Sequence, residues 1–519
     1  MSVNIICKTD MSKQSHALIS YPEAVKAILH TQDPEKFVTL PLTDAVGKIL
    51  ADPVYAQFSV PEVALGAVDG FAVQSCQTID ASPNHPVVLT EWKRCNTGNP
   101  IPQGFDAVIR VESSAIDPSG RLVVTAPIAQ NKNIRLPGED AVFGELILPA
   151  GAGIRPMDIA ALGTYGISEV TVRSMKICLI PSGSELIPLG SKPIGGQIVD
   201  SNTPMAEAYL KFCGADVSRT DIVPDDHLEI EKAVKAAVND ADIVIISAGT
   251  SAGTEDYTEK VIKDLGTLVF HGIALNPGRP GLFGLIDGKP VFGMPGYPAA
   301  AQTFLRAMVA PLLIKWGIKP LASEETLLVR LGDPFESSES MENYSRFSVG
   351  KIGDEYVAIS QPSWSSVQKT TVQSNALIVN PSGTGTFHVG DVVPAIIRCS
   401  RDELDSTILI AGAYERIFEP LSNIAKKRGV TLRYGDRNPK SALSHLENAS
   451  THLSCFVGTD TLPMGDFISV LLAVSPSGEN IYLVHRADLP ENDLIKTLLA
   501  LTTEHEFVEG AAALGYHVR

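Results

Sequence analysis

The sequence predicts a multidomain protein in which a central α/β domain with a mostly parallel sheet lies between all-β segments. The first observation is length, because 519 residues suffice for three or four domains with separate cores. The second is that short apolar strands alternate with helical patterns from about 175 to 318. Strands that are apolar on both faces and separated by helices indicate a parallel sheet covered on two sides. The third is that short Val and Ile runs between Pro and Gly turns flank this stretch, which is typical of all-β structure.

These patterns divide the chain into five parts. The predicted domains are a linker domain at 1–50 and 146–174, a β-rich insert at 51–145, the α/β domain at 175–318, a small β domain at 322–400 and an α/β tail at 401–519. Within the first fifty residues we expect a helix at 22–31, an extended segment at 37–42 and a second helix at 44–51. Residues 399–406, "CSRDELDS", are expected to form a linker before the tail.

The α/β domain is expected to contain a regular series of elements. Its predicted strands lie at 176–181, 216–223, 242–249, 266–272 and 289–296, and its predicted helices at 203–214, 225–238, 255–266 and 297–316. In the first of these helices, Met205, Tyr209 and Phe212 share one face, and Gly214 supplies the stop. In such sheets, ligands bind beyond the C-terminal ends of the strands.

Composition excludes several classes of protein. A net charge of −17 argues against a nucleic-acid surface, which needs clustered Lys and Arg. No run approaches the length of a membrane span, and the N-terminus lacks the pattern of a signal peptide. The seven cysteines are scattered without metal-like spacing, which suits a reducing compartment, and the expected location is the cytoplasm.

The stretch "IISAGTSAGTEDYT" at 245–258 ends a predicted strand in a loop of small and hydroxyl residues. Gly249, Ser251 and Gly253 let backbone N–H groups approach an anion, and Asp256 at the far end could hold a cation beside it. The loop lacks a P-loop or dinucleotide fingerprint, which disfavours a generic nucleotide-dependent enzyme. The alternative is an ordinary strand-to-helix loop whose Thr254 or Glu255 serves the helix N-terminus.

Other predicted strands of the same sheet also end in small-residue loops. Those loops carry Ser182, Gly183, Ser184 and Glu185 after one strand, Pro295, Gly296 and Pro298 after another, and Asn276, Gly278 and Arg279 after a third. Together they predict a site for an extended phosphate-bearing ligand and a divalent cation. One of Asp225 and Asp226 is expected to cap the following helix, which leaves the other free to act.

In this order, the motifs of the chain resemble those of one family, the molybdopterin molybdenumtransferases or MoeA proteins, to which the E domain of gephyrin is also similar. The motifs are "VDGFAV", "NTGNPIPQGFDAVIRVE", "NIRLPGED", "PSGSEL", "GGQIVDSN", "IVPDD", "AGTSAGTEDY", "NPGRP" and "GMPGYP". The resemblance covers roughly residues 20–400. It implies insertion of molybdate, or tungstate, into adenylylated molybdopterin with release of AMP, and dependence on Mg²⁺ or a similar ion.

The resemblance also implies roles for individual residues and a set of partners. Asp225 and Asp256 are expected on the metal side with Glu185 as a third acid, and Asp69, Thr97 and Asp140 are expected to act from the β-rich insert. Considered apart from the resemblance, Asp69-Gly70 is typical of a hairpin turn, and "RLPGED" is typical of a turn with solvated acids. Family members are homodimers whose cleft joins the α/β domain of one subunit to the insert of the other. Other cofactor-synthesis proteins are possible partners, and neither nucleic acid nor membrane is expected.

The chain departs from the family pattern inside the expected site. The stretch "ALGAVDG" replaces Asn-Ser-Ala-Met before Asp-Gly, Ala248 replaces a glycine, and Tyr297 replaces an asparagine. "NPGRP" replaces Lys-Pro-Gly-Lys-Pro, so Asn276 removes a cation and Arg279 keeps charge with altered geometry. These changes leave open an alternative, a non-catalytic sensor or carrier of the cofactor or of molybdate or tungstate.

The tail at 401–519 lies beyond the basic family architecture. Its order of strands and helices resembles part of the periplasmic-binding-protein-like domain that some members carry at this end. That resemblance implies oxyanion sensing, and the alternative is an inert or dimer-stabilising appendage.

Overall fold

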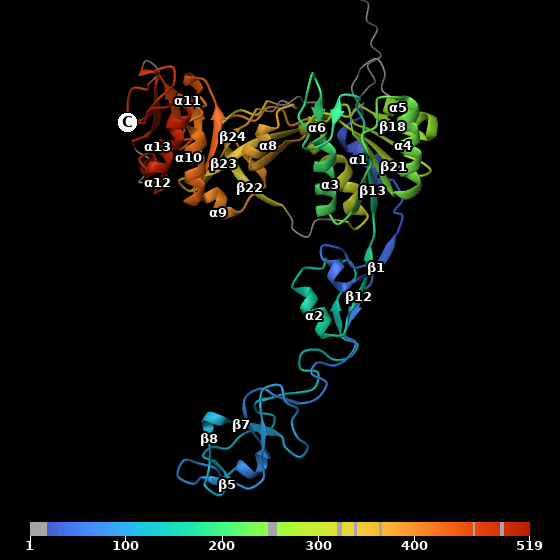
Figure 1. Cartoon of the computed structure of the whole chain (residues 1–519), viewed down its shortest axis with the longest axis vertical. Coiled ribbons are helices and arrows are strands. Elements are labelled where there is room, and N and C mark those ends of the chain that lie inside the picture. The colour runs from blue at the N-terminus through green and yellow to red at the C-terminus, as the bar shows by residue number, and fades with distance from the viewer. Residues whose placement is uncertain are drawn as a thin grey trace, which may run out of the picture.

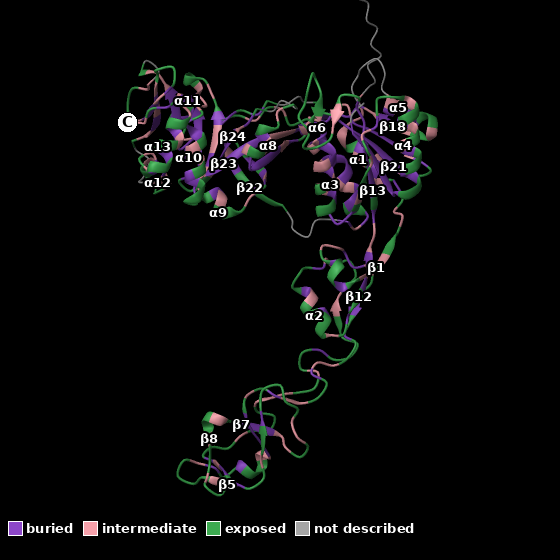
Figure 2. Ribbon diagram, viewed as in Figure 1, coloured by how far each residue is buried: buried purple, intermediate pink, exposed green. Residues whose placement is uncertain are grey.

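The structure is a computed structural model that describes residues 18–247, 257–318, 324–336, 340–362, 366–459, 462–487 and 493–518. The chain is multidomain and mixes α/β units with β-rich units. The α/β domain, the small β domain and the tail lie in a row, and the linker and insert hang from the α/β domain as an arm (Figure 1). Buried residues concentrate in the sheets of the row, whereas much of the arm is exposed (Figure 2). None of the described helices is long and apolar enough to cross a membrane.

The α/β domain is built on a mixed sheet with the strand order β16-β13-β17-β21-β20-β18. Its strands are β13 (Lys176–Pro181), β16 (Asp216–Arg219), β17 (Ile243–Ser247), β18 (Thr267–His271), β20 (Leu282–Ile286) and β21 (Lys289–Met294). The strands β16, β13, β17 and β21 are parallel, while β20 is antiparallel to both of its neighbours. The antiparallel strand β20 was not among the predicted elements.

Helices cover both faces of this sheet because successive strand residues point to opposite sides. They are α1 (Tyr21–Leu29), α3 (Asn202–Phe212), α4 (His227–Asp240), α5 (Tyr257–Leu265), α6 (Pro298–Phe304), the π-helical turn η4 (Leu305–Val309) and α7 (Ala310–Lys315). Ile177 and Leu179 pack with α1, α3, α6, η4 and α7, and the alternate residues Cys178 and Ile180 pack with α4 and α5. Gly214 ends α3 with a φ of 98°, as predicted, but Phe212 is exposed and α3 buries Ala206 and Leu210 instead.

The first fifty residues differ from the prediction in two respects. Helix α1 packs its buried Ala24 and Ile28 into the core of the α/β domain rather than with the linker. The second helix predicted at 44–51 is wrong, because that stretch is the 3-10 turn η1 (Leu42–Ala45) followed by bridges at Ile49 and Leu50. Gly47 has a φ of 84°, which an α-helix cannot contain, and the periodic apolar residues serve the linker core instead.

The arm consists of the linker and the insert. The linker pairs β1 (Phe37–Pro41) with β12 (Glu169–Arg173) and β2 (Val54–Tyr55) with β11 (Leu146–Leu148), and it carries α2 (Asp158–Thr164). The insert contains the sheets β6-β4-β7, β5-β9-β8 and β10-β3. Their bounds are β3 (Leu65–Gly66), β4 (Gly70–Val73), β5 (Val87–Leu89), β6 (Lys93–Cys95), β7 (Ala107–Arg110), β8 (Ser114–Ile116), β9 (Leu122–Val124) and β10 (Ile134–Arg135).

The small β domain is a closed barrel. Its strands are β22 (Glu325–Leu331), β23 (Glu342–Ile352), β24 (Glu355–Ser360), β25 (Ala376–Asn380) and β26 (Val392–Ile397), with α8 (Lys369–Gln373) beside them. The barrel closes because β23 pairs with both β24 and β25 while β22 and β26 complete the ring. The short strand β19 (Leu275–Asn276), which follows β18 in the α/β domain, adds to the edge of β23.

The tail is a further α/β unit with the strand order β28-β27-β29-β31-β30. Its strands are β27 (Thr407–Gly412), β28 (Thr431–Asp436), β29 (Leu453–Val457), β30 (Phe467–Val474) and β31 (Asn480–Arg486). Helices α10 (Phe418–Lys427), α12 (Asp493–Leu501) and α13 (His505–Ala513) share one core cluster, and α11 (Pro439–Glu447) belongs to another. The resemblance of the tail to a periplasmic-binding-protein-like domain stays a prediction.

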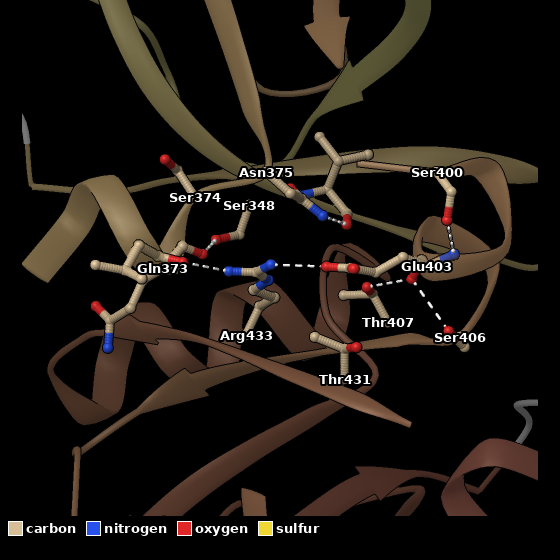
Figure 3. A network of polar contacts seen from close by, with 12 residues as sticks. Ser348, Gln373, Ser374, Asn375, Ser400, Glu403, Ser406, Thr407, Thr431 and Arg433 are labelled. Atoms are coloured by element: carbon tan, nitrogen blue, oxygen red, sulfur yellow. Dashed lines mark hydrogen bonds and ion pairs between the residues drawn. The ribbon is translucent and has the colours of Figure 1, made fainter. Parts of the chain in front are cut away.

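Residues 399–406 do not form a linker, contrary to the prediction. They contain α9 (Arg401–Asp405), whose Leu404 is buried in the barrel core. Glu403 accepts a 2.9 Å hydrogen bond from Arg433 on β28, and Arg433 also donates to the carbonyl oxygen of Val372 (Figure 3). The tail is therefore fixed to the barrel by a polar network. It is not an independent domain that is joined to the barrel only by a linker.

Candidate functional site

The C-terminal ends of three parallel strands meet at one edge of the α/β sheet. Pro181 of β13 is in register with Ser247 of β17, and Ser247 is in register with Met294 of β21. The loops that follow these strands therefore start side by side, as the sequence predicted. This edge is where open α/β sheets bind their ligands.

The loop after β13 is held against the sheet by backbone hydrogen bonds. Ser182 is fully buried, and its N–H donates to the carbonyl oxygen of Ser247 at 2.9 Å. A Cβ at Gly183 would lie 2.8 Å from Leu186 Cγ and 3.0 Å from both carboxylate oxygens of Glu185. Glu185 thus folds back over Gly183, which is buried and is a position that only glycine fits, while Glu185 itself is exposed.

The adjacent acids Asp225 and Asp226 have separate structural roles. Asp226 is the N-cap of α4, and its Oδ1 accepts from the N–H groups of Leu228 and Glu229 at 2.9 and 3.2 Å. Asp225 instead faces the β13 loop, where it accepts from Ser182 Oγ and from the Ser184 N–H, both at 3.3 Å. The expectation that one of the two acids caps the helix is confirmed, and that acid is Asp226; the role of Asp225 in the site stays a prediction.

Three residues at the start of α3 also reach this edge, and the sequence reasoning did not select them. The Asn202 amide donates to the carbonyl oxygen of Gly296 at 2.6 Å, which joins α3 to the loop after β21. Asp200 is buried and accepts from the N–H and the hydroxyl of Thr203. Asn202 Oδ1 is buried without a hydrogen-bond partner in the described part of the chain. The motif "GGQIVDSN" contains them, but an acid and an amide before a helix look like ordinary caps.

The loop after β18 is fastened to the barrel. Leu275 and Asn276 pair in parallel with Glu342 and Asn343, and Asn276 Nδ2 donates to Asn343 Oδ1 at 3.0 Å. Arg279 is exposed, and its carbonyl oxygen accepts from the Ile273 N–H at 2.9 Å. Asn276 is thus used in a domain contact, while the guanidinium of Arg279 stays accessible.

The loop after β21 leads directly into a helix. Pro295 is buried, Pro298 is the first residue of α6, and the N-cap position is taken by Tyr297, whose side chain is 63% exposed. Proline fits at the first helical position because its missing N–H has no intrahelical partner there.

In the insert, Asp69 and Thr97 contact each other. Asp69 Oδ1 accepts from the Thr97 N–H at 2.7 Å, and this hydrogen bond lowers the pKa of the Asp69 carboxyl. The hairpin alternative is wrong, because β3 and β4 on either side of Asp69 belong to different sheets. Asp140 is exposed beside Tyr165, whose pKa is raised by burial and then by the charge of Asp140.

The comparisons with known proteins cover most of the chain. Residues 19–166 match the family described as MoeA N-terminal region (domain I and II), and residues 178–315 match a probable molybdopterin binding domain. A molybdopterin molybdenumtransferase of Haemophilus influenzae is 33% identical over 291 residues, which cover 53% of this chain and 72% of that protein. The chain belongs to the MoeA family.

Other MoeA proteins match over a longer stretch. A molybdopterin molybdenumtransferase of Staphylococcus epidermidis is 28% identical over 421 residues, which cover 77% of this chain and all of that protein. A solved MoeA structure from Pyrococcus horikoshii has a TM-score of 0.64 at 26% identity and covers 74% of this chain and all of that chain. Membership of this family gives the chain a role in molybdenum cofactor biosynthesis.

The structure brings together only part of the predicted MoeA-like site. Ser182, Gly183, Glu185, Asp225, Pro295 and Pro298 lie in loops at one sheet edge. Asp69, Thr97 and Asp140 lie in the arm, far from that edge within the same chain (Figure 1). Gly249, Ser251, Gly253 and Asp256 lie outside the described residues. Among residues that are described, no group of three His, Cys, Asp or Glu side chains could hold a metal ion.

Proposed function

We propose that this protein is a molybdopterin molybdenumtransferase that inserts molybdate, or tungstate, into adenylylated molybdopterin and releases AMP. The observation that carries the proposal is the aligned edge of β13, β17 and β21, where Asp225 is held by Ser182 and Ser184 beside the backbone of Gly183. Acids beside a glycine-containing loop at such an edge suit a pyrophosphate with a divalent cation. Family membership supplies the chemistry that this edge would perform.

In this proposal each loop binds a different part of the substrate. The backbone at Gly183 would accommodate a phosphate group once the Glu185 carboxylate, which covers this position, moves aside. Arg279 would supply positive charge from the loop between β19 and β20, and Asn202 fixes the loop after β21 by donating to the carbonyl oxygen of Gly296. These contacts orient the substrate before any bond is broken.

A divalent cation such as Mg²⁺ would be held by Asp225, with Glu185 and Asp256 as further acids. The donor set fits, because Mg²⁺ prefers carboxylate oxygen ligands and the Asp225 and Glu185 carboxylates both belong to exposed residues. When bound, the ion would stabilise negative charge that develops on the pyrophosphate as AMP leaves. The hydroxyls of Ser182 and Ser184 keep Asp225 oriented toward this position.

The arm would complete the site only in a homodimer. Asp69, Thr97 and Asp140 lie too far from their own α/β edge to contact the same substrate (Figure 1). Two chains placed with the arm of each beside the α/β domain of the other would form two closed clefts. We place this protein in the cytoplasm, because seven scattered cysteines without metal-like spacing fit a reducing environment.

A non-catalytic sensor or carrier is the second candidate. Asn276 stands where the family pattern has lysine, and its amide is occupied by Asn343 of the barrel. That loop therefore offers a phosphate one cation fewer.

The deciding experiment mixes purified protein with adenylylated molybdopterin, molybdate and Mg²⁺ and follows AMP release together with metal-loaded cofactor. A transferase releases AMP only when molybdate is present, and Asp225→Asn abolishes release while pterin binding persists. Tight binding of the pterin nucleotide without any AMP would overturn the proposal and establish the carrier. Replacing molybdate by tungstate identifies the preferred oxyanion.

A further inference from the structure

Three arginines converge where the α/β domain meets the barrel. Arg306 lies on η4, Arg346 on β23 and Arg398 just after β26. They line a cavity of about 20 Å³, together with Gln302, Thr303 and Tyr344. Residues from four separate elements therefore bring their polar groups to one small space.

The positive charge in this cluster exceeds the negative charge. Arg306 forms a two-pronged ion pair with Glu324, so that pair is neutral. Among the described residues, Glu324 is the one carboxylate whose charge acts on these guanidinium groups. The charges of Arg346 and Arg398 remain without a carboxylate of their own.

Arg346 is the most constrained of the three. Arg346 is only 6% exposed, and its Nη1 donates a hydrogen bond to Thr370 Oγ1 at 3.3 Å. A guanidinium carries five N–H donors, and the described residues offer acceptors to few of those of Arg346. Burial and then the charge of Arg398 lower the pKa of Arg346, and burial and then the charge of Arg306 lower that of Arg398.

A buried cation without a counter-charge is costly, and neighbouring like charges add repulsion in a medium of low dielectric. Folded proteins retain such groups where a ligand neutralises them, because the ligand restores both charge balance and hydrogen bonds. The turn that presents Arg306 is a π-helix, a local distortion of helices that is frequent at functional sites. The uncompensated positive charge and the π-helical distortion are two separate observations, and each of them indicates a binding site.

We propose that Arg306, Arg346 and Arg398 form a binding site for one small inorganic anion, which fastens the α/β domain to the barrel. The cavity holds about one water-sized group, so a halide ion fits, whereas a tetrahedral oxyanion or a nucleotide does not. The site is separate from the substrate edge, because Arg306 lies two helical turns beyond Pro298. The anion is a structural element of the junction and takes no part in AMP release.

Thermal unfolding of the full-length protein tests this proposal. The midpoint is measured in gluconate and in sulfate, which are both too large for the cavity, and with increasing chloride or bromide at constant ionic strength. We expect the wild-type midpoint to rise with at least one small anion, because a ligand that binds only the folded state stabilises it. Arg398→Gln should weaken the apparent affinity at least tenfold, since it removes a charged hydrogen-bond donor.

The direction in which Arg398→Gln changes the unfolding midpoint in gluconate distinguishes an arginine that binds an anion from one that only stabilises the fold. Without a small anion, Arg398→Gln removes repulsion, so its midpoint should equal or exceed that of the wild type. A structural role would lower the midpoint equally in every salt and would overturn the proposal. Arg398 borders the cavity but is in part accessible to solvent, so Arg398→Gln should still fold, and Arg346→Gln provides a second test.

A matched control distinguishes this site from the substrate edge. Arg279→Gln removes the exposed arginine of the candidate phosphate loop and leaves the cluster unchanged. The rise in midpoint should persist in Arg279→Gln. If it disappears there and survives in Arg398→Gln, the anion binds at the substrate edge and the proposal is wrong. A wild-type midpoint that responds to none of the small anions would overturn it as well.

Discussion

Replacing Asp333 by asparagine tests how the tail is attached to the barrel. Asp333 is 7% exposed and accepts hydrogen bonds from the Ser360 N–H at 2.7 Å and from Arg437 of the tail at 2.8 Å. His445 Nε2, also in the tail, lies 3.0 Å from its other oxygen. Burial alone would raise the pKa of Asp333, but His445 and Arg437 more than offset it and hold the pKa well below its usual range.

The Asp333→Asn variant leaves Arg437 of the tail without its counter-charge and removes the carboxylate that faces His445. Removing one partner from a buried ion pair costs about 3–5 kcal/mol, and we expect the lower figure because the amide oxygen can still accept from Ser360. About 3 kcal/mol corresponds to a ~150-fold larger population of undocked tail. Hydrogen exchange of peptides from β28 and α11 measures this population directly.

The exposed Asp354 provides the control, because Asp354→Asn makes the same chemical change on the barrel surface. Exchange in the tail should be unchanged in that variant. If Asp333→Asn also leaves tail exchange unchanged, the ion pair does not hold the tail and the reasoning is refuted. The wild type should lose the same docking stability in acid. The pKa of Asp333 is depressed in the folded state. Its contribution to the docking of the tail is therefore fully present above the unfolded-state pKa of about 3.9 and is lost as the pH falls below that value.

Three further predictions concern the candidate active site. Asp226→Ala should cost about 1 kcal/mol of stability through the lost N-cap, measured by urea unfolding, whereas Asp225→Asn should leave stability nearly unchanged and abolish AMP release. Gly183→Ala should displace Glu185 and reduce AMP release at least tenfold, with circular dichroism showing the fold intact; full activity would contradict the assignment of this loop. Mixing inactive Asp69→Asn and Asp225→Asn chains should restore about a quarter of wild-type AMP release, because half of the dimers regain one intact cleft. No recovery after verified subunit exchange would refute a cleft shared between chains.

The strand–helix alternation of the α/β domain could be predicted because its periodic patterns are long and each carries its own stop signals. The different roles of Asp225 and Asp226 could be predicted only as alternatives, since which acid caps the helix depends on the position of Ser184. The false helix at 44–51 has a helical apolar period, but its apolar residues face a core built from residues more than a hundred positions away. Local pattern cannot reveal that Gly47 turns the chain there.

The docking of the tail and the arginine cluster could not be predicted for a related reason. "CSRDELDS" is polar and short, which is typical of a linker, and only the tertiary structure shows Leu404 inside the barrel core. Arg306, Arg346 and Arg398 come from distant parts of the sequence, and no spacing rule joins them. The role of Asn202 could not be predicted because its partner, Gly296, lies on a loop almost a hundred residues later.

Strand β23 contacts both the candidate phosphate loop and the tail. Its first residues pair with Leu275 and Asn276, and near its far end Lys351 accepts a 2.9 Å hydrogen bond from buried His452 of the tail. Its 11 residues span roughly 35 Å, and barrel neighbours on both sides keep it straight and stiff. A ligand or contact that holds the tail in place should therefore also reduce the thermal motion of the loop at Leu275 and Asn276, which the tail does not contact. The added domain would influence turnover by ordering the loop, with no displacement of any catalytic group.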